Sequence, residues 1–189
     1  FGAIGSPTLT VDGSLTVGDV VHHGNTINGV GPITVTGTYD WLGSGLLQGF
    51  PLPDGSSPVV TFAPGSTWNL SGPAGALSRR AVVQHGNAHF SAASMVCSNA
   101  ATWQIAASAT LTFSATGNIT SLGVDCRIRN EGTIRKTGVG TFQFNDTRVL
   151  LENHGLLDVQ GGVFDWLNGG EPTEHSGVFR TTAGALLVA

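Results

Sequence analysis

A short phrase that returns along the chain at a nearly constant distance is the feature that most limits its fold. Each copy begins at a small residue and continues with alternating apolar and polar positions. The central copies are evenly spaced, since the same interval separates Gly86 from Ala109, Ala109 from Gly132, and Gly132 from Gly155. Such a fixed period is typical of solenoids and other repeat architectures. The copies begin at Gly13, Gly37, Ser66, Gly86, Ala109, Gly132, Gly155 and Gly177.

Alternation with a period of two predicts a strand that buries one face in each phrase. Aligned on their first residues, the phrases form one apolar column and one polar column, which predicts strands stacked in register. The apolar column is Leu15, Tyr39, Trp68, Ala88, Leu111, Ile134, Leu157 and Phe179. The polar column is Thr16, Asp40, Asn69, His89, Thr112, Arg135, Asp158 and Arg180.

Two further strand signals accompany most phrases. One precedes the phrase, as at Val60 and Phe62, and the other follows it, as at Met95 and Cys97. Three short strands in a repeat of ~23 residues predict an all-β fold, a single-stranded parallel β-helix with about eight rungs. We expect one domain over residues 1–189, with a proline-rich loop inserted near residues 50–58. Parallel crossovers are nearly always right-handed, so we expect a right-handed helix. A β-sandwich also has short strands, but it would not keep a constant period.

Composition supports this class and excludes others. Glycine supplies 28 of the 189 residues, and only 11% of the chain is charged, against about 25% in typical soluble domains. Disorder requires low hydrophobicity and high charge, which this chain lacks. Lys136 is the only lysine and the formal net charge is −4, so no nucleic-acid partner is expected. No apolar stretch approaches the ~18 residues of a membrane-spanning helix.

Two pairs of residues are expected to cross-link neighbouring rungs. Cys97 and Cys126 lie slightly more than one period apart, so they can bridge adjacent rungs at a corner or remain two buried thiols. Asn130 and Asn153 lie one period apart. Their side-chain amides can stack as an asparagine ladder along the axis.

Several phrases resemble the degenerate repeats of large secreted bacterial β-helix proteins, such as adhesins and autotransporter passengers. The phrases are Asn130–Ile134, Glu152–Gly161 and Thr182–Leu187. The resemblance covers most of the chain from about Pro32 onward. It implies an extracellular or cell-surface location, and its motifs specify a fold rather than an activity.

No catalytic, metal or cofactor residues are expected. A polysaccharide lyase or hydrolase would need clustered carboxylates or a basic residue beside acidic calcium ligands. Asp158 and Asp165 share one rung, but we expect them to be solvated surface groups, like Glu171 and Glu174 in the loop that follows. A zinc site needs three or four converging ligands, whereas the histidines are expected at exposed corners. These histidines are His22, His23, His85, His89, His154 and His175.

The ends of the sequence favour self-assembly. An open rung exposes unpaired backbone groups, and neither end carries an amphipathic capping helix. The possible contact residues are Phe1 and Ile4 at one end and Leu186, Leu187 and Val188 at the other. We therefore expect a non-enzymatic extracellular structural protein whose partner is itself, stacked head to tail into a filament or sheath. A glycan-binding or envelope-binding segment of a larger adhesin is the alternative, and an enzyme is the third. The four tryptophans fall in inward positions, which favours core packing over glycan stacking.

Overall fold

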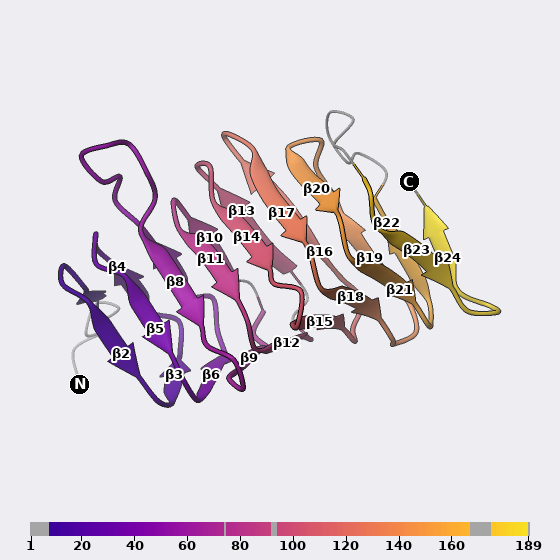
Figure 1. Cartoon of the computed structure of the whole chain (residues 1–189), viewed down its shortest axis with the longest axis horizontal. Helices are drawn as coiled ribbons and strands as arrows, with labels where there is room; N and C mark the ends of the chain where they lie inside the picture. The colour runs from indigo at the N-terminus through magenta and orange to yellow at the C-terminus, as the bar shows by residue number, and fades with distance from the viewer. Residues whose placement is uncertain (1–7, 74, 92–93, 167–174, 189) are drawn as a thin grey trace.

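The computed structural model describes residues 8–73, 75–91, 94–166 and 175–188. In these residues the chain is a parallel β-solenoid of about seven complete coils, without a helix (Figure 1). The coils follow one another along the long axis, from the N-terminal end at the left of Figure 1 to the C-terminal end at the right. This confirms the fold class expected from the repeat.

Three sheets form the wall of the solenoid. Sheet 1 contains β1 (Thr8–Thr10), β4 (Thr26–Asn28), β7 (Leu46–Gln48), β10 (Gly75–Ser78), β13 (Ser94–Ser98), β16 (Gly117–Leu122), β19 (Thr141–Phe144), β22 (Val163–Asp165) and β24 (Leu186–Val188). Sheet 2 contains β2 (Leu15–Val17), β5 (Ile33–Val35), β8 (Val59–Phe62), β11 (Ala81–Gln84), β14 (Thr102–Ile105), β17 (Cys126–Asn130) and β20 (Val149–Asn153). Sheet 3 contains β3 (Val20–His22), β6 (Thr38–Trp41), β9 (Thr67–Leu70), β12 (Asn87–Phe90), β15 (Thr110–Phe113), β18 (Thr133–Lys136), β21 (Leu156–Val159) and β23 (Val178–Thr181).

The chain visits the three sheets in turn, so three successive strands make one coil. Coil 1 is β1–β3, coil 2 is β4–β6, and the later coils are numbered in the same way. Within coils 1 to 7 each strand pairs in parallel with the strand three places later in the chain. The proline-rich segment 50–58 forms the long connection between β7 and β8, the largest loop at the upper left of Figure 1.

The inward column of sheet 3 follows the expected register from Tyr39 onward. Tyr39 lies opposite Trp68, and Leu157 lies opposite Phe179 at the other end. Tyr39 is 2% exposed and Trp68 is fully buried. The remaining tryptophans, Trp41, Trp103 and Trp166, are also buried, as their inward positions predict.

The first phrase does not belong to this column. Leu15 lies in sheet 2, opposite Ile33, and the residue opposite Tyr39 is Val20 of β3. The error arises because coil 1 is shorter than the central coils, so Leu15 reaches its ladder partner within less than one full period. A constant step along the sequence therefore assigns Leu15 to the wrong sheet. The described residues hold seven strands in sheet 2, and the solenoid has about seven complete coils, against the eight expected.

Aromatic rings fill the centre of the solenoid from one coil to the next. The Trp68 ring stacks on Phe62 of sheet 2 with centroids 4.6 Å apart, and farther along the axis Phe113 stacks on Phe142 at 3.9 Å. Such pairs contribute about 0.5–1.5 kcal/mol each beyond the burial of their area. Over the described coils the inward face is therefore a core packed with side chains from one coil to the next.

Candidate functional site

Cys97 and Cys126 form a disulfide in the structure. Cys97 lies in β13 of coil 5 and Cys126 begins β17 of coil 6. Both side chains are buried, at 1% and 0% exposure. The bond therefore ties sheet 1 of one coil to sheet 2 of the next across a corner. The sequence left open whether these cysteines form a disulfide or remain two buried thiols, and the structure has the disulfide.

Asn130 and Asn153 are hydrogen-bonded through their side chains. Asn130 Nδ2 donates to Asn153 Oδ1 at 2.7 Å, and both residues are fully buried. Each amide also donates to a backbone carbonyl of sheet 3, that of Leu156 for Asn130 and that of Val178 for Asn153. Gln84, which the sequence analysis missed, donates to the Thr110 carbonyl in the same way, at 3.0 Å. Gln84 occupies the same ladder column as the two asparagines, but Ile105 separates it from Asn130, so the stacked amides are Asn130 and Asn153.

Arg80 is a second buried group that the sequence did not indicate. Its side chain is fully buried, and its guanidinium donates to three backbone carbonyls, those of Gly29, Gly31 and Gln48. Burial lowers the pKa of Arg80. Arg80 follows β10 of coil 4 and reaches carbonyls of coils 2 and 3, so one side chain binds three coils at the corner between sheets 1 and 2.

Asp158 is buried, and the expectation that it is a solvated surface carboxylate is wrong. Its side chain is 1% exposed because Arg180 and Arg135, which lie beside it in the sheet 3 ladder, cover it from the two neighbouring coils. Arg180 donates to both carboxylate oxygens, at 2.8 and 2.7 Å, and Gln160 donates at 2.7 Å. The hydrogen bonds from Arg180 lower the pKa of Asp158 most. The carboxylate is fully occupied by these partners, so it is not available as a catalytic acid or base.

Asp165 is also buried, again contrary to expectation. It lies in β22 of sheet 1 and accepts a hydrogen bond from Gln143 at 2.9 Å. Asp158 and Asp165 therefore lie in different sheets and form no catalytic pair. Glu171 and Glu174 lie outside the described residues.

Lys136 occupies an inward position of sheet 3, opposite Phe113 on one side and Val159 on the other. Its side chain is 1% exposed and its ammonium donates to the Gly138 carbonyl. Burial lowers the pKa of this lysine. A buried ammonium in a position that is apolar in adjacent coils weakens the fold unless its partners offset the desolvation.

Replacing Lys136 by methionine is therefore expected to raise the free energy of unfolding by about 1 kcal/mol. Methionine keeps a similar length and removes the cost of burying the charge. Urea unfolding followed by circular dichroism measures the effect. A loss of stability in Lys136→Met would show that the bond to Gly138 outweighs the desolvation.

The histidines are not all at exposed corners. His22 is 2% exposed and therefore contradicts the expectation, because it lies opposite Trp41 in the inward column of sheet 3. His23 and His89 are exposed, while His154 is hydrogen-bonded to the Ser176 hydroxyl at 2.9 Å. Among the residues that the structure describes, no group of three or more His, Cys, Asp or Glu side chains could hold a metal ion.

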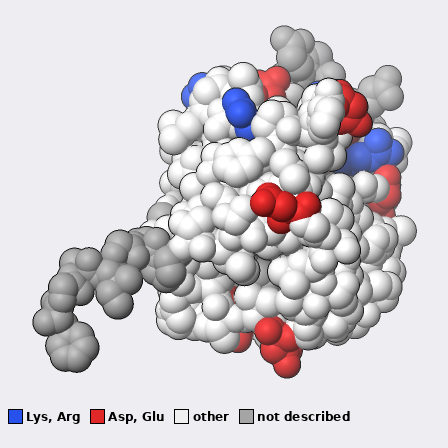
Figure 2. Space-filling model, turned by 90° about the vertical axis from the view of Figure 1, so that its left-hand side faces the viewer, with Lys and Arg blue, Asp and Glu red and all other residues white. Residues whose placement is uncertain are grey.

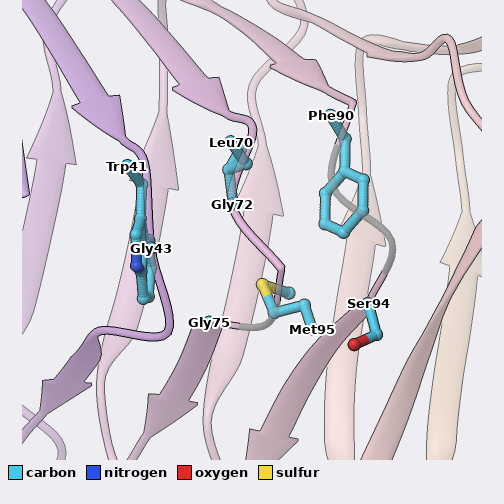
Figure 3. Close-up of a pocket in the computed structure, with 8 residues that line it drawn as sticks. All are labelled: Trp41, Gly43, Leu70, Gly72, Gly75, Phe90, Ser94 and Met95. Atoms are coloured by element: carbon cyan, nitrogen blue, oxygen red, sulfur yellow. The ribbon is translucent and has the colours of Figure 1, made fainter. Parts of the chain in front are cut away.

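A small apolar opening lies at the corner between sheets 3 and 1 in coils 2 to 5 (Figure 3). The room inside it for a water-sized sphere is only about 10 Å³, far below the ~300–1,000 Å³ of ordinary ligand sites. It exists because glycines follow the strands at this corner, and a Cβ on Gly75 would lie 2.8 Å from the Trp41 ring. The opening is too small for a sugar chain. Its lining residues are Trp41, Gly43, Leu70, Gly72, Gly75, Phe90, Ser94 and Met95.

The C-terminal edge of the solenoid leaves part of the core uncovered. Phe179 of β23 is 39% exposed, whereas its ladder partner Leu157 in the preceding coil is 1% exposed. Leu186 of β24 is 53% exposed, and Leu187 is partly buried against the core. Within the described part of the chain, β23 pairs only with β21 and β24 only with β22. Leu186, Leu187 and Val188 thus form an edge strand with one unpaired side.

The N-terminal edge has the same character. Leu9 of β1 is 52% exposed, whereas its inward ladder partner Ile27 is 9% exposed. Leu15, Val17 and Val20 are only partly buried. Among the strands that the structure describes, β1, β2 and β3 each pair on one side only. Phe1 and Ile4 lie outside the described residues.

Charge is distributed unequally along the axis. No Lys or Arg precedes Arg79, so the formal charge of −4 belongs to the part of the chain before it, from Asp12, Asp19, Asp40 and Asp54. Figure 2 looks at the N-terminal end and shows mainly uncharged residues, with a few separate acidic groups and some basic groups towards the top and right of the view. At the other end Arg180, with a side chain 56% exposed, lies in the last strand of sheet 3. Arg180 is paired with Asp158, and from residue 150 onward five acidic residues stand against this one arginine, so both ends of the sequence are acidic.

No known family matches this chain. Neither a protein-family model, nor a curated protein, nor a solved structure matches the sequence or the fold. No helix in the described part has the length and hydropathy that a bilayer crossing requires. We take the two open edges of the solenoid, at β1–β3 and at β23 and β24, as the candidate functional site, and we infer its function from their geometry.

Proposed function

We propose that this chain is a non-enzymatic extracellular structural protein whose copies stack end to end into a filament or sheath. The exposed core at the two edges carries the proposal, above all the 39% exposure of Phe179 and the 52% exposure of Leu9. Side chains at the equivalent inward positions of neighbouring coils are buried. A further coil on either edge would bury these groups and extend each parallel ladder.

The stacking follows from the strand order. In a head-to-tail contact, β1 of one copy pairs with β24 of the next, because these are the two end strands of sheet 1. This adds a strand to an open sheet edge, in which backbone hydrogen bonds supply affinity. Such a contact is heterologous and leaves a free edge at each end, so it propagates into a fibre.

The composition of the edge strands also favours strand addition. Neither described edge strand contains a lysine, the residue that most often blocks strand addition.

The extracellular location is supported by chemistry. A buried disulfide in a chain of low charge suits an oxidising compartment, and the repeat resembles secreted surface proteins. The glycan-binding alternative has less support, because the four tryptophans that would supply stacking platforms are buried.

The test uses two edge variants, Leu9→Lys and Phe179→Lys. Each places a charge in one uncovered end of the core and leaves the other end intact. We expect the unmodified chain to elongate in light scattering and electron microscopy, and each variant alone to stay monomeric. A 1:1 mixture of the two variants should form dimers only, because it contains one intact head and one intact tail.

Val139→Lys is the matched control, since Val139 is 88% exposed and precedes β19, a strand that pairs on both sides and so lies away from either edge. It should elongate like the unmodified chain. Circular dichroism verifies that both edge variants keep their strand content. A chain that stays monomeric at high concentration overturns the proposal, and so do edge variants that each dimerise alone.

A further inference from the structure

His22 is a buried histidine in β3, the edge strand of coil 1. Its Nε2 lies 2.7 Å from the Asn25 carbonyl oxygen, and its Nδ1 lies 2.9 Å from the Tyr39 hydroxyl. The ring stacks on Trp41 with centroids 4.9 Å apart. A Cβ on Gly45 would lie 2.4 Å from Nε2, so the pocket fits the imidazole closely.

These contacts suit the neutral ring only. A carbonyl oxygen can only accept a hydrogen bond, so Nε2 carries the proton and donates to Asn25. Nδ1 is then the acceptor, and the Tyr39 hydroxyl donates to it. A second proton on Nδ1 would force the hydroxyl of Tyr39, itself 2% exposed, to turn away. Its hydrogen would then lose its acceptor inside the core.

The charged groups near His22 do not stabilise a second proton on its ring. His23 comes directly after β3 and disfavours a positive charge on His22, and the cationic Arg80 lies near Tyr39. Of the three carboxylates of the first two coils, Asp19 accepts a hydrogen bond from the Thr38 amide and Asp40 accepts one from Asn69. The third, Asp12, lies in the connection between β1 and β2.

The remaining neighbours have little effect on the protonation of the His22 ring. The segment 42–46, which packs on it, contains no titratable residue. The Trp41 face and the hydrogen bond to the Asn25 carbonyl favour an imidazolium, but burial outweighs them and lowers the pKa of His22.

We propose that His22 is an acid-sensitive latch that holds coil 1 against coil 2 while its ring is neutral and releases it on protonation. The stability that this latch adds is fully present above the ordinary histidine pKa of about 6.5 and is lost as pH falls towards the lowered value in the fold. Coil 1 carries the N-terminal edge, so acid would also weaken end-to-end stacking. That consequence rests on the proposed function, whereas the latch itself does not.

Amide hydrogen exchange at pH 7.5 and 5.0 tests the latch in dilute, monomeric chain, with labelling times scaled for the intrinsic exchange rate. We expect protection of residues 15–28 to fall about fivefold at pH 5.0 relative to coils 4 to 6, as for the loss of one net hydrogen bond. His22→Phe should show no such fall, and His23→Gln, at the exposed neighbour, should behave like the unmodified chain.

Equal protection of coil 1 at both pH values overturns the latch, as does a fall that persists in His22→Phe. If that variant does not form coil 1, an NMR titration of His22 in the unmodified chain decides. The ring of His22 should take up its second proton only below pH 6.5. Protonation above pH 6.5 would contradict the proposal. Light scattering at the same pH values reports stacking separately, so the latch and the assembly can fail independently.

Discussion

Replacing Cys97 and Cys126 together by alanine is expected to lower the free energy of unfolding by about 3–4 kcal/mol. The residues are 29 positions apart, and the chain-entropy relation for a loop of that length gives this magnitude. Alanine avoids leaving an unpaired hydroxyl at two fully buried positions. Urea unfolding monitored by circular dichroism measures the loss.

A reducing agent supplies the internal control for the disulfide. It should destabilise the unmodified chain by a similar amount and leave the double alanine variant unchanged. Hydrogen exchange should show the loss of protection first at β13 and β17, which the bond connects. Equal stability of the oxidised and reduced chains would show that stacking alone fixes this corner.

Replacing Arg80 by methionine is expected to lower the free energy of unfolding by about 3 kcal/mol. The change removes three hydrogen bonds, of 2.8 to 3.2 Å, to the carbonyls of Gly29, Gly31 and Gln48. Relief from burying a cation offsets part of the loss, so the net effect is smaller than the sum of the bonds. Coils 2 and 3 should lose protection first, and urea unfolding combined with hydrogen exchange measures both effects.

The adjacent arginine gives a matched control. Arg79 is exposed, so Arg79→Met makes the same change of charge without removing a buried contact, and its effect should stay within about 0.5 kcal/mol. Arg80→Lys should be intermediate, because an ammonium lacks the planar fork that reaches three carbonyls. Equal effects of the two methionine variants would mean that charge, not the buried contacts, sets the stability.

The repeat predicted most of the fold because alternation and period are backbone properties. From Tyr39 to Phe179 the inward column of sheet 3 has the expected register. The prediction of register failed in coil 1, where the step from Leu15 to its ladder partner Ile33 is shorter than the period of the central coils. A single sequence offers one example of each coil, so a shortened coil cannot be told from a phrase in another sheet.

The misplacement of the first phrase also hid the burial of His22. Once Val20 is placed opposite Tyr39, His22 falls opposite Trp41, an inward position. Alternation would then have predicted its burial, as it does for Lys136 beside Phe113. Arg80 is different, because its burial depends on contacts with coils 2 and 3 that no periodic pattern encodes. Asp158 stands between Arg135 and Arg180 in the polar column, so the period does place the two arginines that cover it. The two edges could be located from the sequence. Their exposed side chains could be identified only from the strand pairing in the structure.

The parallel ladder also bears on how such a chain can change in length. Each strand bonds only to strands in the two adjacent coils, as Thr133 does with Thr110 and Leu156. Removing or duplicating the residues between equivalent ladder positions therefore joins two surfaces that are already alike. Gene duplication or deletion of one repeat would lengthen or shorten the rod by about 4.8 Å. For this architecture, size is a quantity that evolution can adjust one coil at a time.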